Sequence, residues 1–171
     1  MRTKTLFVIL LAMVISVSEA QTKKDKKEQK LEKKEQQYAL AREVVANGNF
    51  TFNSQWMNTR AGKRMLMDAG RGYLTIQGDK TKAYLPYIGI VRVATMYAGG
   101  GIEFDGEMRD YQVRENDKRR TVTVEFKISS PEETYDVFVQ FFKGLSAKVT
   151  VNSNKRESIS YDGVISPLDV D

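Results

Sequence analysis

Apolar and polar residues alternate along most of the chain from Asn49 onward. The clearest run places Val122, Val124, Phe126 and Ile128 between Thr121, Thr123, Glu125 and Lys127. The same period of two recurs at 50–56, 135–141 and 145–151. This period predicts strands that turn one face to a core and the other toward water, which is typical of antiparallel sheets.

Short polar segments separate these runs and predict hairpin turns. They are Gln77-Gly78-Asp79, Asn116-Asp117, Lys143-Gly144 and Asp162-Gly163. Glycine, asparagine and aspartate are the residues that tight hairpin turns prefer. No helical segment intervenes and no internal repeat is visible, so we expect about eight strands in one up-and-down meander. The expected fold is all-β, an antiparallel barrel spanning residues 49–171, with a sandwich as the alternative closure.

A helical pattern precedes the strands. Leu31, Tyr38, Ala41 and Val45 fall on one helical stripe, and Asn47-Gly48 supplies a stop signal. We therefore predict a helix over 38–48 that docks on the barrel. Phe138 and Phe142 fall on the outer face of their strand, and this helix is a candidate to cover them.

Residues 21–37 form a lysine-rich segment that also contains four acidic residues. One interpretation is a basic patch for anionic lipid or nucleic acid. The other is a solvated helix stabilised by pairs of glutamate and lysine, which the mixed charge signs favour. We expect a partly helical or disordered spacer here.

The first twenty residues have the pattern of a secretory leader. Arg2 and Lys4 precede an apolar run over 6–17, and Ser18-Glu19-Ala20 supplies small residues for cleavage. A run of about twelve apolar residues is too short to span a bilayer comfortably. We expect export to the periplasm or the medium, with no transmembrane span in the mature form. The chain has no cysteine, which excludes an acylated-cysteine anchor and any disulfide.

Net charge argues against a nucleic-acid surface on the barrel. The formal charge of the whole chain is +5. Residues 21–48 hold eight basic and five acidic residues, whereas residues 49–171 hold seventeen and sixteen. The predicted barrel is therefore almost neutral, and we expect no nucleic-acid partner.

The chain contains no histidine, which excludes many catalytic designs. Ser-His and Cys-His pairs and imidazole metal ligands are impossible. Glu103, Asp105 and Glu107 would share one face of a strand and could meet a calcium ion, although the full calcium-loop pattern is missing. Gly99-Gly100-Gly101 lacks the lysine of a phosphate loop. We predict no catalytic residues, no metal and no cofactor.

The stretch AYLPYIGI, residues 83–90, interrupts an otherwise buried strand. Pro86 cannot donate a ladder hydrogen bond, so the strand ends or bends there. Gly89 permits an unusual backbone angle or a close approach. We interpret Pro86 and Gly89 as a structural corner. A surplus of tyrosines accompanies it, and tyrosine suits cavity mouths. Tyr84, Tyr87, Tyr97 and Tyr161 are the candidate ligand-binding residues.

Four blocks of sequence together resemble a known family. They are an opening NFTF strand, YLPY-x-G at Tyr84 to Gly89, GGGIEF at Gly99 to Phe104 and ISYDG at Ile159 to Gly163. In this order they resemble the bacterial exported family catalogued as domain of unknown function 4251, from about Val44 to Leu168. The resemblance implies a lipocalin-like, calycin-type barrel and no assigned activity. The family often has arginine after the final glycine of the second block, where this chain has Ile90.

Three functions remain open from sequence. The first is an exported module that binds a small apolar ligand in a barrel cavity. The second is a structural or protein-interaction module of the cell envelope, with a barrel filled by its own side chains. The third and most remote is a carboxylate-based hydrolase, which would need two acids at catalytic spacing in one cleft.

Overall fold

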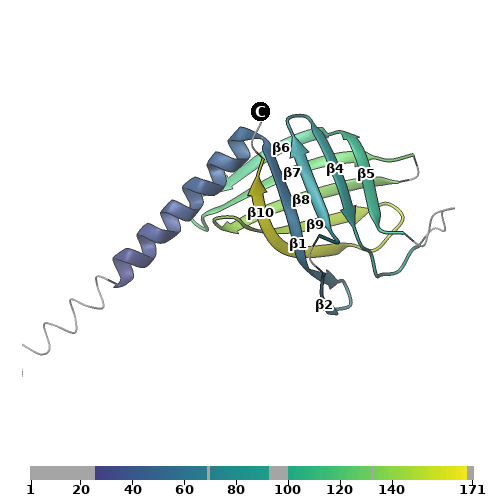
Figure 1. Ribbon diagram of the computed structural model, residues 1–171, viewed down its shortest axis with the longest axis horizontal. Helices are drawn as coiled ribbons and strands as arrows, with labels where there is room; N and C mark the ends of the chain where they lie inside the picture. The colour runs from purple at the N-terminus through teal and green to yellow at the C-terminus, as the bar shows by residue number, and fades with distance from the viewer. Residues whose placement is uncertain (1–25, 69, 93–99, 132, 169–171) are drawn as a thin grey trace, which may run out of the picture. The chain divides into compact units, whose positions relative to one another are not determined.

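The computed structural model describes residues 26–68, 70–92, 100–131 and 133–168 (Figure 1). The predicted leader and Tyr97 lie outside these ranges. The ten strands are β1 (Asn49–Thr59), β2 (Arg64–Leu66), β3 (Tyr73–Gln77), β4 (Lys80–Leu85), β5 (Ile102–Glu107), β6 (Arg109–Asn116), β7 (Thr121–Ser129), β8 (Thr134–Lys143), β9 (Ser146–Ser153) and β10 (Ile159–Pro167).

The strands form one antiparallel sheet that nearly closes on itself. Its order is β5-β4-β3-β1-β10-β9-β8-β7-β6, and β2 pairs with β1 off this path. Only Met108 separates β5, which pairs with β4, from β6, which pairs with β7. β5 and β6 are thus two halves of one bent strand that joins both edges of the sheet. The predicted up-and-down barrel of about eight strands, preceded by a helix, is confirmed.

The sheet wraps around a core of large side chains. Figure 1 shows β1, β4 and β5 in front, with β7, β8 and β9 crossing behind them. Phe50, Phe52, Phe141 and Tyr161 all point inward and are fully buried. The rings of Phe50 and Phe141 meet edge to face, with centroids 5.5 Å apart. Close-packed aromatic and aliphatic side chains therefore fill the described part of the interior.

The N-terminal helix spans residues 26–47, and Gly48 follows it with φ +67°. Such a left-handed glycine commonly ends a helix. Side chains at 26–36 are exposed, whereas Tyr38, Ala41, Val44 and Val45 are buried members of the barrel core. No helix among the described residues is long and apolar enough to cross a membrane.

The second half of the helix contacts the turns at one end of the barrel. The Tyr38 hydroxyl donates a hydrogen bond to the Asp117 carboxylate at 2.8 Å, and Arg42 pairs with Glu115 at 2.9 Å. Burial and the bond to Asp117 raise the pKa of Tyr38 to about 12. Phe142, which this helix was a candidate to cover, is 38% exposed, whereas Phe138 is half-buried. The apolar stripe of the helix packs against the barrel core instead.

Asp162 and Gly163 lie inside β10, so the predicted hairpin turn there is wrong. Asp162 accepts a hydrogen bond from Asn58 and lies 3.5 Å from the cationic groups of both Arg64 and Lys148. A Cβ on Gly163 would lie 2.1 Å from the carbonyl oxygen of Asn53. The lack of a side chain at Gly163 allows β1 to approach closely, and β1 has a bulge opposite this position.

Candidate functional site: the seam groove

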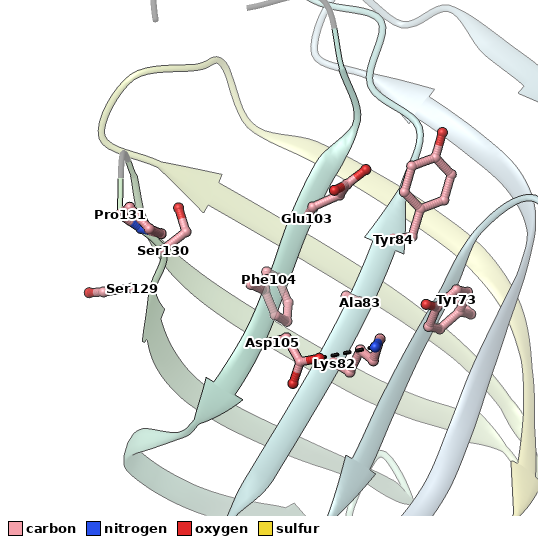
Figure 2. A pocket seen from close by; sticks show the side chains of 10 residues that line it. All are labelled: Tyr73, Lys82, Ala83, Tyr84, Glu103, Phe104, Asp105, Ser129, Ser130 and Pro131. Carbon is pink, nitrogen blue, oxygen red and sulfur yellow. Dashed lines mark ion pairs between the residues drawn. The ribbon is translucent and has the colours of Figure 1, made fainter. Parts of the chain in front are cut away.

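The two ends of the sheet diverge where β5 and β7 face each other. Pairing with β7 begins only at Arg109, opposite Lys127, and β5 itself has no ladder to β7. A groove of about 600 Å³ opens at this seam. We call it the seam groove; its lining consists of Tyr73, Lys82, Ala83, Tyr84, Glu103, Phe104, Asp105, Ser129, Ser130 and Pro131 (Figure 2).

One wall of the seam groove is the outer face of β3, β4 and β5. Strand register places Tyr73 opposite Tyr84 and Tyr84 opposite Glu103, so the three form a row across three strands. In Figure 2, Tyr84 and Glu103 project to the same side of the sheet from neighbouring strands. Tyr84 is 38% exposed. The row combines aromatic faces with a carboxylate, which suits a ligand that has both apolar and cationic parts.

A second row of side chains lies beside the first, and its two opposite charges form an ion pair. Lys82 and Asp105 are cross-strand partners, and their charged groups are 3.0 Å apart. The hydrogen bond to Asp105 raises the pKa of the Lys82 ammonium. Both side chains are more than half exposed, so water screens the pair and its contribution to stability is small. Glu103 therefore carries the free negative charge of the groove.

The opposite wall of the groove is the turn from β7 to β8, and it is well fixed. The Ser130 hydroxyl accepts a hydrogen bond from the Glu133 N–H at 3.2 Å. Ser129 accepts a hydrogen bond from the Arg109 guanidinium and lies 3.1 Å from the Thr134 hydroxyl. These bonds hold the serines at the rim of the groove, across β5 from the tyrosines (Figure 2).

A buried ion pair lies behind this wall. Arg156 Nε donates to both carboxylate oxygens of Glu133, at 2.9 and 3.0 Å, and the side chains are 6% and 2% exposed. Glu133 also accepts a hydrogen bond from the hydroxyl of Tyr135, whose pKa is raised by burial. Arg156 Nη1 donates to the carbonyls of Gly100 and Gly101, which lead into β5. The pair thus fixes both walls of the seam groove relative to each other.

Sequence reasoning missed this ion pair. In the sequence, Lys155-Arg156 is a basic pair flanking a strand, which is typical of strand-edge protection, whereas Arg156 is buried in the structure. Its guanidinium also lies over the ring of Tyr87, 5.3 Å from the centroid. Local sequence offers no signal for Glu133 as the partner, because Glu133 precedes β8 and Arg156 follows β9, and pairing of these two strands brings the residues together.

The four candidate tyrosines occupy different environments. Tyr84 lies on the outer face and lines the seam groove. Tyr161 is fully buried in the interior, and its hydroxyl donates to the Pro86 carbonyl at 2.7 Å. The Tyr87 hydroxyl lies within hydrogen-bonding distance of the Ile90 and Glu157 carbonyls and accepts from the Glu157 N–H. Tyr97 lies outside the described residues. The structure brings Tyr87 and Tyr161 together around Pro86 and leaves Tyr84 outside.

Pro86 and Gly89 form the corner that ends β4. Pro86 follows the last residue of the strand, and its carbonyl is the acceptor for Tyr161. The backbone of Gly89 does not have positive φ. A Cβ there would instead lie 2.5 Å from the Tyr87 hydroxyl oxygen. Gly89 therefore makes room for the tyrosine that ties this loop to the segment before β10.

We expect Gly89→Ala to cost about 2 kcal/mol of unfolding free energy, since an added methyl displaces the Tyr87 hydroxyl from its partners. Pro86→Ala should cost less than about 1 kcal/mol, because the φ near −65° to which proline is restricted is one that alanine also adopts. Thermal unfolding of both variants checks this ranking. Equal losses would contradict the role assigned to Gly89.

Tyr84 also lines a second groove, of about 370 Å³. Methionines dominate it: Met57, Met65 and Met67 line it together with Leu66, Asp68, Arg71, Pro86 and Ile88. Met57 and Met65 are cross-strand partners on β1 and β2. Leu66 is 70% exposed and Ile88 is 47% exposed. Flexible thioether side chains adapt to apolar ligands of varied shape.

The acidic residues do not form a metal site. Among the described residues, no group of three or more histidine, cysteine, aspartate or glutamate side chains could hold a metal ion. Asp105 is bound to Lys82, and Glu103 lies two positions away on the same strand. The arrangement offers an aromatic surface, one free carboxylate and fixed hydroxyl groups, which is chemistry for binding.

The fold defines a small antiparallel β-barrel protein with a nearly closed sheet and an open seam. The chain belongs to the family described as "Domain of unknown function (DUF4251)", whose model matches residues 32–165. This confirms the resemblance seen in the sequence blocks. None of the curated proteins compared with the chain matches it.

One solved structure similar to this chain is the crystal structure of a DUF4251 family protein from Bacteroides eggerthii. The two are 19% identical, with a TM-score of 0.59, over 77% of this chain and 87% of that chain. At this level of identity the likeness extends to the fold.

Proposed function

We propose that the protein is an exported, non-enzymatic interaction module that holds a partner on the outside of its barrel, in the seam groove. The observation that carries this proposal is the row Tyr73–Tyr84–Glu103 facing a fixed wall across the diverging ends of the sheet. Concave sites with apolar surface and a few placed polar groups are the usual binding sites of proteins.

The packing of the interior supports an external site over a ligand in the barrel. The largest inward-facing side chains, among them Tyr161, Phe50 and Phe52, are fully buried against one another. A small barrel filled in this way has its binding chemistry on the outer faces and loops. The chain's leader pattern supports export, and its lack of histidine supports a role without catalysis.

A second candidate function is the binding of a small apolar ligand in the methionine-lined groove. Met57 on β1, Met65 on β2 and Met67 directly after β2 favour it, together with the exposed Leu66 and Ile88. Tyr84 lines both grooves, so a ligand there would share this residue with a partner in the seam groove.

Site-specific photo-crosslinking in the producing cells tests the proposal. A photoreactive phenylalanine analogue replaces Ser129 at the groove rim, and a control variant carries it at Gln140, which is also an exposed strand residue. We expect discrete adducts from position 129 and none from position 140, and intact-mass measurement gives the size of the partner. Adducts from both positions alike, or from neither, would contradict the proposal.

A further inference from the structure

At the seam, one edge of β5 has no strand partner in the part of the chain that the structure describes. All six of its residues pair with β4, from Leu85 opposite Ile102 to Lys80 opposite Glu107. In an antiparallel ladder, every second residue directs its N–H and C=O to the partner strand and the others direct theirs away. Within the described part of the chain, no backbone group on the far side receives these bonds. Among the described residues, the seam groove therefore contains an open row of backbone donors and acceptors.

The charges on this edge are all acidic. Natural edges are blunted by charged side chains, especially lysine, by proline or by a covering segment. The sequence of β5, IEFDGE, has three exposed acidic residues and neither lysine nor proline, so its charge opposes an acidic strand and favours a basic one. Its continuation β6, by contrast, contacts the helix through Glu115, which pairs with Arg42. The open part of the strand thus coincides with the groove.

The charges beside this edge indicate which side chain an added strand would place there. Glu103 is exposed and has no ion-pair partner among the described residues, whereas neighbouring Asp105 is paired with Lys82. Tyr84 lies directly across the ladder from Glu103, and Tyr73 lies beyond it. A cation held against a tyrosine ring and a carboxylate gains from both interactions.

Building on the function proposed above, we propose that the partner is an extended peptide segment that adds to the free edge of β5 and places a lysine or arginine side chain against Tyr84 and Glu103. Addition of a strand to an open sheet edge takes its affinity from main-chain hydrogen bonds and its specificity from side-chain pockets. Four residues of added strand span about 13 Å, which matches the part of β5 from Ile102 to Asp105.

The experiment starts from a random peptide library displayed on phage and selected on the chain from residue 21 to residue 171. We expect enriched peptides to share one lysine or arginine within β-branched residues. A synthetic peptide of the enriched sequence should bind the Glu103→Gln variant about tenfold more weakly, which corresponds to a loss of about 1.4 kcal/mol in binding free energy. Glu43→Gln, the same charge change on an exposed helical residue, should leave binding unchanged.

Backbone methylation of that peptide tests strand addition independently of its side chains. N-methyl groups on alternate residues remove the N–H donors along one edge of the peptide and place methyl groups where a partner strand would approach. One methylated series should therefore lose binding at least tenfold and the other should retain it. Equal binding of both series would overturn strand addition. Acidic consensus peptides, or an absence of enrichment, would overturn the peptide proposal.

The crosslinking result at position 129 distinguishes the peptide proposal from the proposed binding function of the seam groove, on which it rests. Adducts at position 129 with the mass of an oligosaccharide or another non-peptide would refute the peptide partner while leaving the seam groove as the binding site. An absence of adducts at position 129 would remove both.

Discussion

Replacing Arg156 with methionine should lower the free energy of unfolding by about 3–5 kcal/mol, because it leaves the carboxylate of Glu133 buried without its counter-ion. Glu133 is 2% exposed at its side chain and accepts two hydrogen bonds from Arg156 Nε. The carbonyls of Gly100 and Gly101 would lose their donor as well. Urea unfolding followed by circular dichroism measures the loss.

Two further variants isolate the cause. Arg156→Met combined with Glu133→Gln removes both charges and keeps an acceptor for the Tyr135 hydroxyl, so it should recover about 1–2 kcal/mol of the loss. Lys82→Met breaks an exposed pair of similar length, 3.0 Å, and should cost less than about 1 kcal/mol. A cost for Arg156→Met as small as that for Lys82→Met would contradict the structural importance of the buried pair.

The strands were predictable because their signal is local. A period of two places Val122, Val124 and Phe126 on one face wherever the strand pairs, and burial on one side then selects that face. The turns at Gly78 and Gly144 were predictable for the same reason, since both glycines have positive φ in short hairpins. These features require only neighbours within a few residues.

Features made by distant segments were not predictable in the same way. Arg156 reads as one of two basic residues beside a strand until Glu133 is placed next to it by the sheet. Gly163 follows aspartate and so reads as a turn, yet β10 continues through it because it pairs with β1 and β9. In both cases a tertiary contact overrides the local preference.

For the seam groove, too, features of single strands were predictable from sequence and their tertiary arrangement was not. Tyr84 was predicted as a ligand-binding residue from its chemistry, and Glu103 and Asp105 were predicted to share one face of a strand, which is the exposed face of β5. Their arrangement as a groove depends on the bend at Met108, where one strand leaves β4 and joins β7. Alternation alone places side chains above or below a sheet, and it gives no information on where the sheet fails to close.

Gly163→Ala should destabilise the barrel by about 3 kcal/mol, because an added Cβ would lie 2.1 Å from the Asn53 carbonyl oxygen and 2.8 Å from the Phe52 ring. Neither contact can relax cheaply: the carbonyl belongs to β1 next to its bulge, and Phe52 is fully buried in the core. The strands must separate locally, which weakens pairing of β1 with β10 at the centre of the sheet.

Gly106→Ala is the matched control, since this glycine also lies in a strand without positive φ. Its Cβ would meet only the Ile128 Cδ1 atom, at 4.0 Å, so the variant should stay within about 0.5 kcal/mol of the parent. The midpoint and slope of urea unfolding for both variants provide the comparison. Equal midpoints would mean that β1 and β10 are farther apart than the structure places them, and the interpretation of Gly163 as a close-approach residue would be wrong.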